Sequence, residues 1–389
     1  MYLAGGVRTP FGAFGGALAE VSAAQLGATA IKAVLSRTGI PAQDIGEVFF
    51  GNVIGAGQGQ NIARQCSLGA GVPKEVGCTT INKVCGSALK AIVSASQAIQ
   101  CRDAEMVIAG GTESMSRAPY LLEKARTGYR MGNGELVDAM IHDGLWDVYK
   151  NVHMGQCGDL CARKYNFTRQ QQDDYAIESY KRAQRGWETG FFKELVVPVE
   201  VKTRKGVAIV DRDEEPFKFV EERFRSLPPA FGPESQITAG NSSGISDGAA
   251  ACLVISEEKM KSLGVKPMGR ILGYANVALD PDWFTIAPIY SIRKLADQLS
   301  LKLSDVDLFE INEAFSVVAM VAMKELGLEH AKVNVNGGAV SIGHPIGASG
   351  ARITITLLQA LRQRGGKLGI ASLCIGGGEA LAIAVENCA

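Results

Sequence analysis

The chain has no excess charge of either sign: its 389 residues include 40 lysines and arginines and 40 aspartates and glutamates. Proteins that bind nucleic acid or an anionic membrane usually present a basic patch, so neither partner is expected. No apolar run reaches the ~18 residues of a membrane-spanning helix, and the first residues resemble neither a secretory signal nor a transit peptide. These absences predict a soluble, cytoplasmic protein.

Histidine is scarce, with four residues, and the nine cysteines are odd in number and irregularly spaced. In a long chain without a secretion signal, this argues against a disulfide framework and for reduced thiols, most of them in the core. Glycine is in excess: it makes up 46 of the 389 residues, or about 12%, whereas ordinary domains contain about 7%. Because the glycines cluster in short motifs, we expect the backbone to approach other groups closely at several points.

The two ends of the chain repeat similar elements in the same order. In each, an apolar strand ends at asparagine, a second strand leads to a helix of small residues, and a third apolar stretch ends in glycines and a glutamate. The matched pairs are 44–52 with 305–312, 79–88 with 333–350, and 107–113 with 373–379, with the second strands at 79–84 and 333–335. Three matches in one order predict a duplicated β/α half.

Strands that alternate with helical stretches predict sheets covered by helices. The expected helix at 85–100 consists mostly of small residues, and Lys90 is its only charge, so it can be packed on nearly every side. Its counterpart at 347–361 begins with four similarly small residues. We therefore expect two central helices between two sheets, an α/β fold of five layers, αβαβα.

A segment of different character separates the halves. Residues 117–241 contain charge-rich stretches such as 202–222 and a helix-like pattern at 169–185, which indicates an inserted domain and not a linker. The predicted units are an N-terminal half of 1–116 plus 242–268, an inserted loop domain of 117–241, and a C-terminal half of 269–389.

Cys85 is the first catalytic candidate. It stands where a strand is expected to end and a helix to begin, so free amides and the positive end of the helix dipole would favour its thiolate. A cysteine with a lowered pKa at such a position is a typical nucleophile. The alternative is a buried structural thiol, the more common state of a free cysteine.

Three further residues could complete a site around Cys85. His344 lies in a loop whose glycines and proline could hold a neutral imidazole, as a Cys–His pair requires. Cys374 ends a strand before three glycines, whose amides could approach a carbonyl oxygen. Asn312 ends the second echoed strand and could hold a water molecule. Taken singly, each has a structural explanation: a satisfied loop histidine, a core cysteine beside a tight turn, and a structural asparagine.

Together these segments closely resemble the thiolase family of acetyl-CoA C-acyltransferases. The resemblance covers the whole chain, including RTPFG at 8–12, and four signatures occur in the family's order. They are NKVCGSALK at 82–90, NEAF at 312–315, GGA through GHPIGASG at 337–350, and CIGGG at 374–378. The resemblance implies the thiolase fold, in which two related halves in five layers carry an inserted loop domain.

The resemblance also implies a ping-pong mechanism. Cys85, activated by His344, would attack one acyl-CoA thioester and release CoA. Cys374 would then take a proton from the α-carbon of a second acetyl-CoA, and the carbanion would attack the acyl-enzyme. By the same analogy His344 and a water on Asn312 would hold the enolate oxygen, and the amides of Cys85 and Gly376 would hold the acyl-enzyme oxygen.

A tunnel for the pantetheine arm of CoA beside the loop domain is implied in the same way. The matching positions are Leu145, His153, Met154, Phe231, Ala239, Ser243, Ala314 and Phe315, with Phe284 near the acyl group. Their alternative is ordinary core. The adenine end corresponds least well, since Lys218, Arg223 and Arg225 could be solvated charges or phosphate contacts.

A metal site is not expected. His153, Cys157 and Cys161 are spaced four apart, as on one face of a helix. Three ligands from one straight helix cannot surround a tetrahedral zinc without a fourth from elsewhere. The resemblance likewise implies no redox cofactor, because the CoA thioesters are themselves the substrates.

The resemblance therefore predicts a short-chain thiolase of lipid and fatty acid metabolism. It would condense two acetyl-CoA to acetoacetyl-CoA and CoA, run the reverse thiolysis, and form a homotetramer through the insertion. A broad-specificity degradative 3-ketoacyl-CoA thiolase is the alternative, since Glu379 follows the glycines where many biosynthetic members carry a small or apolar residue. A non-catalytic acyl-CoA or lipid-binding protein of the same fold is the alternative from another class. A decarboxylating condensing enzyme is disfavoured because a second motif histidine is missing.

Overall fold

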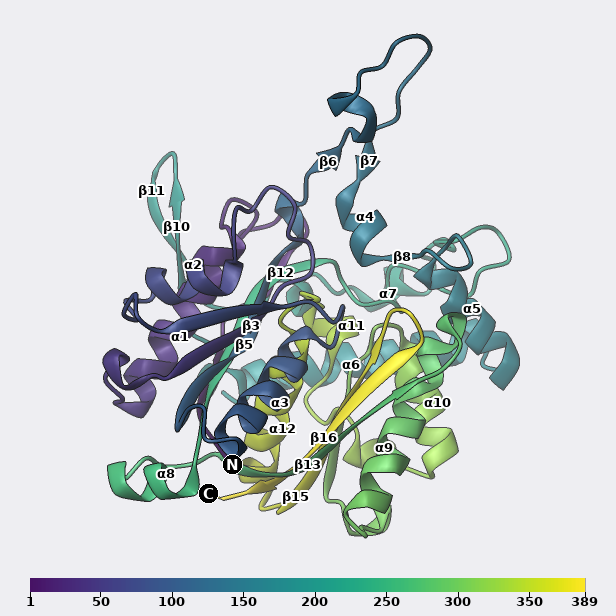
Figure 1. Ribbon diagram of the computed structural model, residues 1–389. Helices are drawn as coiled ribbons and strands as arrows, with labels where there is room; N and C mark the ends of the chain where they lie inside the picture. The colour runs from purple at the N-terminus through teal and green to yellow at the C-terminus, as the bar shows by residue number, and fades with distance from the viewer. Residues whose placement is uncertain (389) are drawn as a thin grey trace.

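The main strands form two sets that come from the two ends of the chain (Figure 1). The computed structural model describes residues 1–388. The main strands are β1 (Tyr2–Arg8), β3 (Glu47–Gly51), β4 (Gly77–Ile81), β5 (Met106–Ser114), β12 (Ser246–Ile255), β13 (Gly269–Ala278), β14 (Leu308–Ile311), β15 (Leu368–Ile375) and β16 (Glu379–Asn387). The short β2 (Gly12–Ala13) pairs with β12. The N-terminal set has the order β4-β3-β5-β12-β1, and the C-terminal set has the order β14-β15-β16-β13.

The two sets share one pattern of strand directions. In the N-terminal set β3 is parallel to β4 and to β5, and β12 is antiparallel to β5 and to β1. In the C-terminal set β14 is parallel to β15, and β16 is antiparallel to β15 and to β13. A parallel bridge from Phe309 to Val333 stands where β4 stands in the N-terminal set. The duplication predicted from the sequence is therefore present in the topology.

Two details of the predicted repeat are wrong. Residues 333–335 form isolated bridges and not a strand, because Asn334 adopts a left-handed φ of 48° that interrupts the extended backbone. The third matched pair also differs, since Gly110 and Gly111 lie inside β5 whereas residues 376–378 form the turn from β15 to β16. In the N-terminal half the equivalent connection, from β5 to β12, holds the whole insertion.

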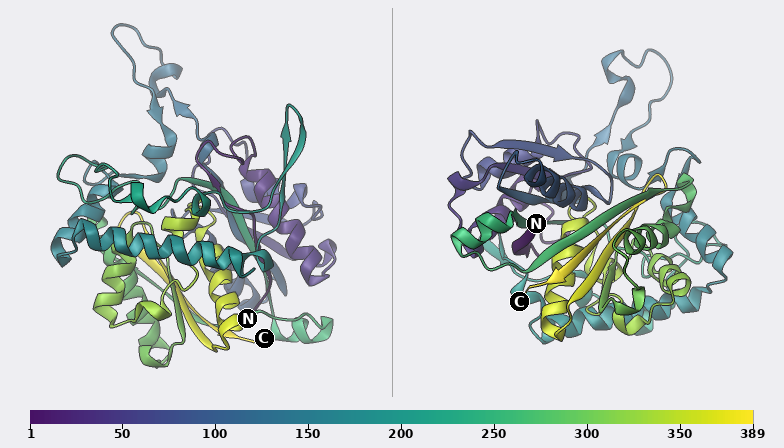
Figure 2. Two further views of the ribbon diagram at one scale, coloured as in Figure 1. Left: turned by 180° about the vertical axis from the view of Figure 1, so that it is seen from behind. Right: turned by 60° about the horizontal axis from the view of Figure 1, so that its bottom comes forward.

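Helices lie in three layers, one between the strand sets and one outside each (Figure 2). Their bounds are α1 (Ala23–Thr38), α2 (Ile62–Gly69), α3 (Ser87–Gln100), α8 (Glu257–Leu263), α9 (Ala287–Gln298), α10 (Ser316–Leu326), α11 (Ala339–Ile342) and α12 (Ser349–Arg364). The central layer is α3 and α12. α1 and α2 cover the N-terminal strands, and α9 covers the C-terminal strands with α10 packed beside it.

Alternation of side chains along the strands explains the layers, because successive side chains point to opposite faces of a sheet. In β12, Leu253 packs into the core with α1 and α2, whereas Val254 packs into the central core with α3 and α12. In β15, Leu373 faces that central core, and Ile370 faces a third core with α9 and α10. The five-layer αβαβα architecture is confirmed.

The sequence suggested two separate sheets, but in the structure the two sets are joined. β1 and β13 pair antiparallel at Tyr2–Arg270 and Leu3–Gly269, which joins the sets edge to edge into one ten-stranded sheet. The central helices α3 and α12 approach each other closely between the two strand sets. A Cβ at Gly350 of α12 would lie 2.3 Å from the backbone nitrogen of Leu89 in α3, so only glycine fits at that crossing.

The insertion runs from the end of β5 to the start of β12. Its elements are β6 (Tyr120–Leu121), β7 (Val137–Asp138), α4 (Ala139–Gly144), β8 (Trp146–Asp147), β9 (Val152–His153), α5 (Met154–Tyr165), α6 (Arg169–Glu188), the hairpin β10 (Val199–Thr203) and β11 (Gly206–Val210), and α7 (Glu221–Phe224). The predicted helix at 169–185 is α6, which starts with a capping box between Thr168 and Gln171. The arm that holds β6 and β7 projects from the body (Figure 1). Within residues 1–388, no helix combines the length and apolarity needed to cross a membrane.

Candidate active site

Three of the four catalytic candidates follow or end strands, and the fourth, His344, lies in the loop between α11 and α12. Cys85 lies between β4 and α3, Asn312 directly follows β14, His344 precedes α12, and Cys374 is the penultimate residue of β15. All four are buried. The backbone amide of Asn312 donates to the carbonyl of Ser372, 2.9 Å away, which fixes it beside the strand that carries Cys374.

Close backbone contacts hold the loop of His344 against the ends of β3 and β5. A Cβ at Gly51 would lie 2.5 Å from the carbonyl oxygen of Gly347, and one at Gly111 would lie 2.0 Å from the same oxygen. Both distances are too short for a side chain, so glycine is required at both positions. The expected close backbone approach therefore occurs beside the catalytic candidates.

A buried glutamate that we did not identify from the sequence ties the same parts together. Glu113, at the end of β5, accepts hydrogen bonds from the backbone amides of Val53 (3.1 Å), Ile54 (3.2 Å) and Gly347 (2.9 Å) and from Asn52 Nδ2 (2.9 Å). Burial raises its pKa to about 7. The only signal in the sequence was its place in the repeated apolar-glycine-glutamate stretch.

Strained backbone places Cys85. The preceding Val84 has a φ of 47°, unusual for a β-branched residue and worth roughly 1–3 kcal/mol of strain. A hydrogen bond from the Val84 amide to Asn82 Oδ1, 3.0 Å long, stabilises this turn. β4 therefore ends at Ile81 and α3 begins at Ser87, so Cys85 sits in the connection and not in the helix.

The prediction that Cys85 has a lowered pKa is wrong. Burial raises the pKa of its thiol to about 11, and a hydrogen bond from the Gly376 amide only partly offsets this. Desolvation of the thiolate outweighs the backbone donors because water is excluded from the thiol. The Gly376 amide therefore lies close to Sγ of Cys85, the atom that would carry an acyl group.

Cys374 is also held as a neutral thiol. Burial raises its pKa, and the neighbouring Cys85 raises it further. Each thiol therefore needs a proton acceptor before it can react as a thiolate.

His344 is a neutral imidazole, as predicted. Burial, and to a smaller extent the nearby Arg352, lower its pKa to about 3. Its Nδ1 lies 2.6 Å from Ser349 Oγ, and its backbone amide donates to the carbonyl of Gly244 at 3.0 Å. Nε2 lies 3.4 Å from Asn312 Nδ2. A base that is neutral over the whole physiological range is thus placed beside the Asn312 amide.

Two of these partners were missed in the sequence. Arg352 is fully buried in α12 and donates to Asn312 Oδ1 and to Glu310 Oε1, both at 2.8 Å. Ser349 also donates to the carbonyl of Pro345 at 3.0 Å. The sequence offered one signal for Arg352, which stands in the middle of a largely apolar helical stretch. A buried charge is rare unless it is paired, so an arginine there indicates a buried ion pair.

Four of the expected substrate-binding residues lie within the insertion and contact one another in pairs. His153 stacks on Phe231 at 4.5 Å between ring centroids, and the Met154 amide donates to the Leu145 carbonyl at 2.9 Å. Met154 reaches the turn at residues 376–378, which follows Cys374 and which we call the catalytic turn, because a Cβ at Gly376 would lie 3.1 Å from its Cε.

The remaining expected residues lie on the segment before β12 (Ala239 and Ser243), directly after Asn312 (Ala314 and Phe315), and between β13 and α9 (Phe284). The Ser243 amide donates to the Ala314 carbonyl at 3.0 Å, and Phe284 lies 6.4 Å from Phe315 between ring centroids. Ala239 is exposed. It lines a hollow of about 220 Å³ together with Lys218 and Arg223.

Lys218, Arg223 and Arg225 lie in or beside α7. Arg225 pairs with Asp174 at 2.6 Å, and Lys218 lies 3.6 Å from Glu215. These two cations are therefore partly neutralised by carboxylates.

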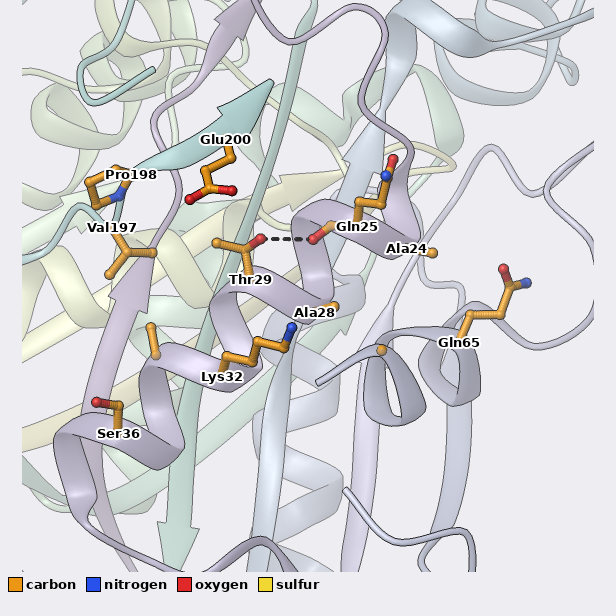
Figure 3. Close-up of a pocket in the computed structure, with 12 residues that line it drawn as sticks. Ala24, Gln25, Ala28, Thr29, Lys32, Ser36, Gln65, Val197, Pro198 and Glu200 are labelled. Carbon is orange, nitrogen blue, oxygen red and sulfur yellow. Dashed lines mark hydrogen bonds between the residues drawn. The ribbon is translucent and has the colours of Figure 1, made fainter. Parts of the chain in front are cut away.

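Two other hollows differ in whether they reach the catalytic candidates. One of about 400 Å³ is lined by Val84, Met154, Gly376 and Gly377, so it opens onto the catalytic turn. Another of about 760 Å³ lies between α1, α2 and residues 197–200 (Figure 3). Gln25, Lys32 and Glu200 line it, but its lining contains neither cysteine nor histidine, so it offers no acyl-transfer chemistry.

The three residues considered for metal binding are engaged otherwise. His153 Nδ1 accepts the amide of Gly155 at 3.1 Å, and burial raises the pKa of the Cys157 thiol to about 12 and of the Cys161 thiol to about 11. Protonated thiols are poor metal ligands. In the part of the chain that the structure describes, no three histidine, cysteine, aspartate or glutamate side chains gather in metal-binding geometry.

Comparison with known proteins gives matches over nearly the whole chain. Residues 1–258 match the family model described as thiolase, N-terminal domain, and residues 265–387 match thiolase, C-terminal domain. The acetyl-CoA acetyltransferase of Schizosaccharomyces pombe is 47% identical over 389 residues, which are 100% of this chain and 98% of that protein.

Two solved structures share the fold. The Acat5 thiolase of Ascaris suum, crystallised in complex with coenzyme A, has a TM-score of 0.94 and 43% identity and covers 99% of each chain. The acetyl-CoA acetyltransferase of Bacillus anthracis has a TM-score of 0.96 and 39% identity and covers 99% of this chain and 98% of its own. This chain belongs to the thiolase family.

Proposed function

We propose that the chain is an acetyl-CoA C-acetyltransferase. It condenses two acetyl-CoA to acetoacetyl-CoA and CoA by a ping-pong Claisen reaction, and catalyses the reverse thiolysis. The observation that carries this proposal is the pair of buried, neighbouring thiols with the Gly376 amide close to Cys85, together with a buried, neutral His344 that contacts Asn312. Two thiols are needed because one is acylated while the other moves a proton.

In the first half-reaction Cys85 attacks the thioester carbonyl of acetyl-CoA as His344 Nε2 takes its proton. The tetrahedral intermediate collapses, the carbon–sulfur bond to CoA breaks, and the leaving thiolate takes the proton of Cys374. Acetyl-Cys85, the Cys374 thiolate, protonated His344 and free CoA result. Because burial raises the pKa of both thiols, neither forms a thiolate until the reaction moves its proton.

In the second half-reaction the Cys374 thiolate takes a proton from the α-carbon of a second acetyl-CoA. The enolate carbon attacks the acetyl carbonyl on Cys85 and forms the new carbon–carbon bond. The bond to Cys85 sulfur breaks, and the released thiolate recovers the proton from His344. Every group then returns to its starting protonation state.

Two oxygens gain negative charge in this cycle, and each needs fixed donors. The amides of Cys85 and Gly376 serve the oxygen on the acyl-enzyme, and His344 with a water held by Asn312 serves the enolate oxygen. One such donor typically contributes about 10²–10³ to the rate.

The test of the nucleophile is Cys85→Ser. Radiolabelled acetyl-CoA should acylate the wild-type protein within one turnover and leave the variant unlabelled on the same timescale. Cys157→Ser is the matched control, since Cys157 is a buried thiol that has no role in the mechanism. Equal labelling of Cys85→Ser and wild type would overturn the assignment.

Short-chain preference is part of the proposal. Leu145, His153, Met154, Phe231, Ala239, Ser243, Ala314 and Phe315 would contact the pantetheine arm, and Phe284 would limit the acyl group. Thiolysis rates should fall from acetoacetyl-CoA to long-chain 3-ketoacyl-CoA, whereas equal rates would favour the broad-specificity degradative alternative. Absence of acetoacetyl-CoA thiolysis would favour the non-catalytic acyl-CoA-binding alternative.

A homotetramer is proposed from the projecting arm. Tyr120, Met131 and Leu136 on this arm are 64%, 99% and 67% exposed, and apolar side chains on an extended arm favour burial against another copy. Replacing residues 122–136 by a short glycine-serine linker should lower the mass measured by light scattering. An unchanged mass would contradict this role.

We also propose a cytoplasmic enzyme of lipid and fatty acid metabolism that uses no metal and no redox cofactor. All nine cysteines are unpaired, and a reducing compartment keeps the two catalytic thiols active. Full activity after dialysis against a chelator tests the independence from metal.

A further inference from the structure

Arg352 is a buried charge that contacts Asn312, one of the catalytic candidates. It lies in α12 with its side chain 1% exposed, and its Nη1 pairs with Glu310 Oε1 at 2.8 Å. Its Nη2 donates to Asn312 Oδ1, also at 2.8 Å. The guanidinium thus touches the asparagine of the enolate site.

This contact fixes which way the Asn312 amide points. A guanidinium has only donors, so the atom that faces it must be an acceptor. The amide oxygen of Asn312 therefore faces Arg352, and the NH₂ group faces His344, with Nδ2 3.4 Å from Nε2. The amide orientation, which is ordinarily assigned from the surrounding hydrogen bonds, has one solution here.

The same logic continues to the imidazole. Because Nδ2 of Asn312 can only donate, Nε2 of His344 must be the ring nitrogen without a proton. The proton then sits on Nδ1 and is donated to Ser349 Oγ at 2.6 Å, and the Ser349 hydroxyl donates to the Pro345 carbonyl at 3.0 Å. Four hydrogen bonds in series therefore share one direction, which begins at Arg352.

We propose that Arg352 is a positioning residue that sets this direction and so keeps Nε2 of His344 unprotonated to receive the proton of Cys85. Arg352 does not touch the reacting atoms and acts through Asn312. The inference rests on the proposed function, because it assigns the basic nitrogen of the acyl-transfer base.

The tautomer can be observed directly. The chain has four histidines, so ¹⁵N spectra of protein labelled in the histidine rings are simple, and the His344→Asn variant identifies the His344 signals. We expect wild-type His344 to show a protonated Nδ1 and an unprotonated Nε2. In Asn312→Asp, whose carboxylate is an acceptor at both oxygens, the proton should move to Nε2. A wild-type Nε2–H tautomer, or an unchanged tautomer in Asn312→Asp, would overturn the proposal.

Arg352 itself is tested with its ion-pair partner, because a single loss would leave Glu310 buried and unpaired. In Glu310→Gln/Arg352→Gln both charges are removed, and the amide introduced in place of the guanidinium can match either orientation of Asn312. We expect mixed tautomers at His344 and a loss of about 10²-fold in condensation, comparable with loss of one oxyanion donor. Arg352→Lys keeps a cationic, donor-only group and should retain the wild-type tautomer.

A thermodynamic cycle separates positioning from mere stability. If Arg352 acts through Asn312, the double replacement should cost no further rate in an Asn312→Ala background. Fully additive losses, or a double variant with wild-type rate and tautomer, would contradict the proposal. Acylation of wild-type Cys85 by labelled acetyl-CoA is measured alongside: its absence would defeat the proposed function, whereas a wrong tautomer with normal acylation would defeat only the role of Arg352.

Discussion

The carbonyl oxygen of Gly347 lies against the Cα of Gly111, so that a Cβ at position 111 would be 2.0 Å from it. Gly111 belongs to β5 of the N-terminal half, and Gly347 to the loop between His344 and α12 of the C-terminal half. The contact therefore brings the two copies of the duplicated unit together beside His344, the proposed catalytic base. Its closeness leaves the loop almost no freedom on this side.

Gly111→Ala should therefore displace the His344 loop. We expect a loss of about 1–3 kcal/mol in the free energy of unfolding from overpacking, and roughly 10²-fold slower acylation, since a misplacement of about 1 Å can have that effect. Urea unfolding and single-turnover labelling measure the two. Gly77→Ala in β4 is the control, because its Cβ would have its nearest neighbour at 3.9 Å. Equal behaviour of the two variants would show that the contact does not position the loop.

The architecture could be predicted from the sequence because each element of the duplicated half has a local pattern of apolar, small or glycine residues. The apolar strands before Asn52 and Asn312 resemble each other in sequence, and so do the small-residue helices at 85–100 and 347–361. The exceptions were set by single backbone conformations. The left-handed φ of Asn334 removes a predicted strand, and that of Val84 moves Cys85 out of the helix.

The residues around the candidate site were harder to predict, since their roles depend on burial and on partners far away in the chain. Glu113 and Gly347 are 234 positions apart, and Arg352 and Asn312 are 40 apart. The raised pKa of Cys85 was missed for the same reason. A helix start suggests a stabilised thiolate, but only the folded structure shows that burial dominates.

Asn312→Ala should slow condensation more than it slows acylation. The side chain would support the enolate oxygen, which forms only in the second half-reaction, and loss of one such donor typically costs about 10²–10³ in rate. Steady-state condensation and single-turnover labelling of Cys85 separate the two steps. Asn312 is fully buried, so a thermal unfolding curve must accompany the kinetics. A folded variant with unchanged condensation would refute the role.

His344 should make the protein less stable in acid. Its pKa is lowered to about 3 in the folded chain by burial, compared with about 6.5 when unfolded. Between these values the unfolded chain binds a proton that the folded chain does not, so stability falls as the pH falls below about 6.5. The loss is about 1.4 kcal/mol per pH unit, or roughly 2 kcal/mol at pH 5.

The His344→Asn variant lacks this titration. Its packing cost is the same at every pH, so its free energy of unfolding relative to wild type should improve by roughly 2 kcal/mol between pH 8 and pH 5. Denaturant unfolding of both proteins at the two pH values measures the change. A difference between the proteins that stays constant with pH would contradict a buried, neutral His344.

The ion pair between Lys83 and Glu379 should help align the donors around the acyl-enzyme. Lys83 lies two residues before Cys85, and Glu379 lies three after Gly376, so their contact joins the two segments that supply those amides. The side chains are 23% and 33% exposed, and pairs near the surface contribute up to about 1 kcal/mol, roughly fivefold in rate.

Lys83→Met and Glu379→Gln should each slow acylation by that factor or less. The double variant should be no slower than either, and 1 M salt should slow only the wild type. Lys261→Met/Glu257→Gln, which breaks an exposed pair on α8, is the control and should leave acylation unchanged. Independent, additive losses from Lys83 and Glu379 would show that the two side chains act separately and not as a pair.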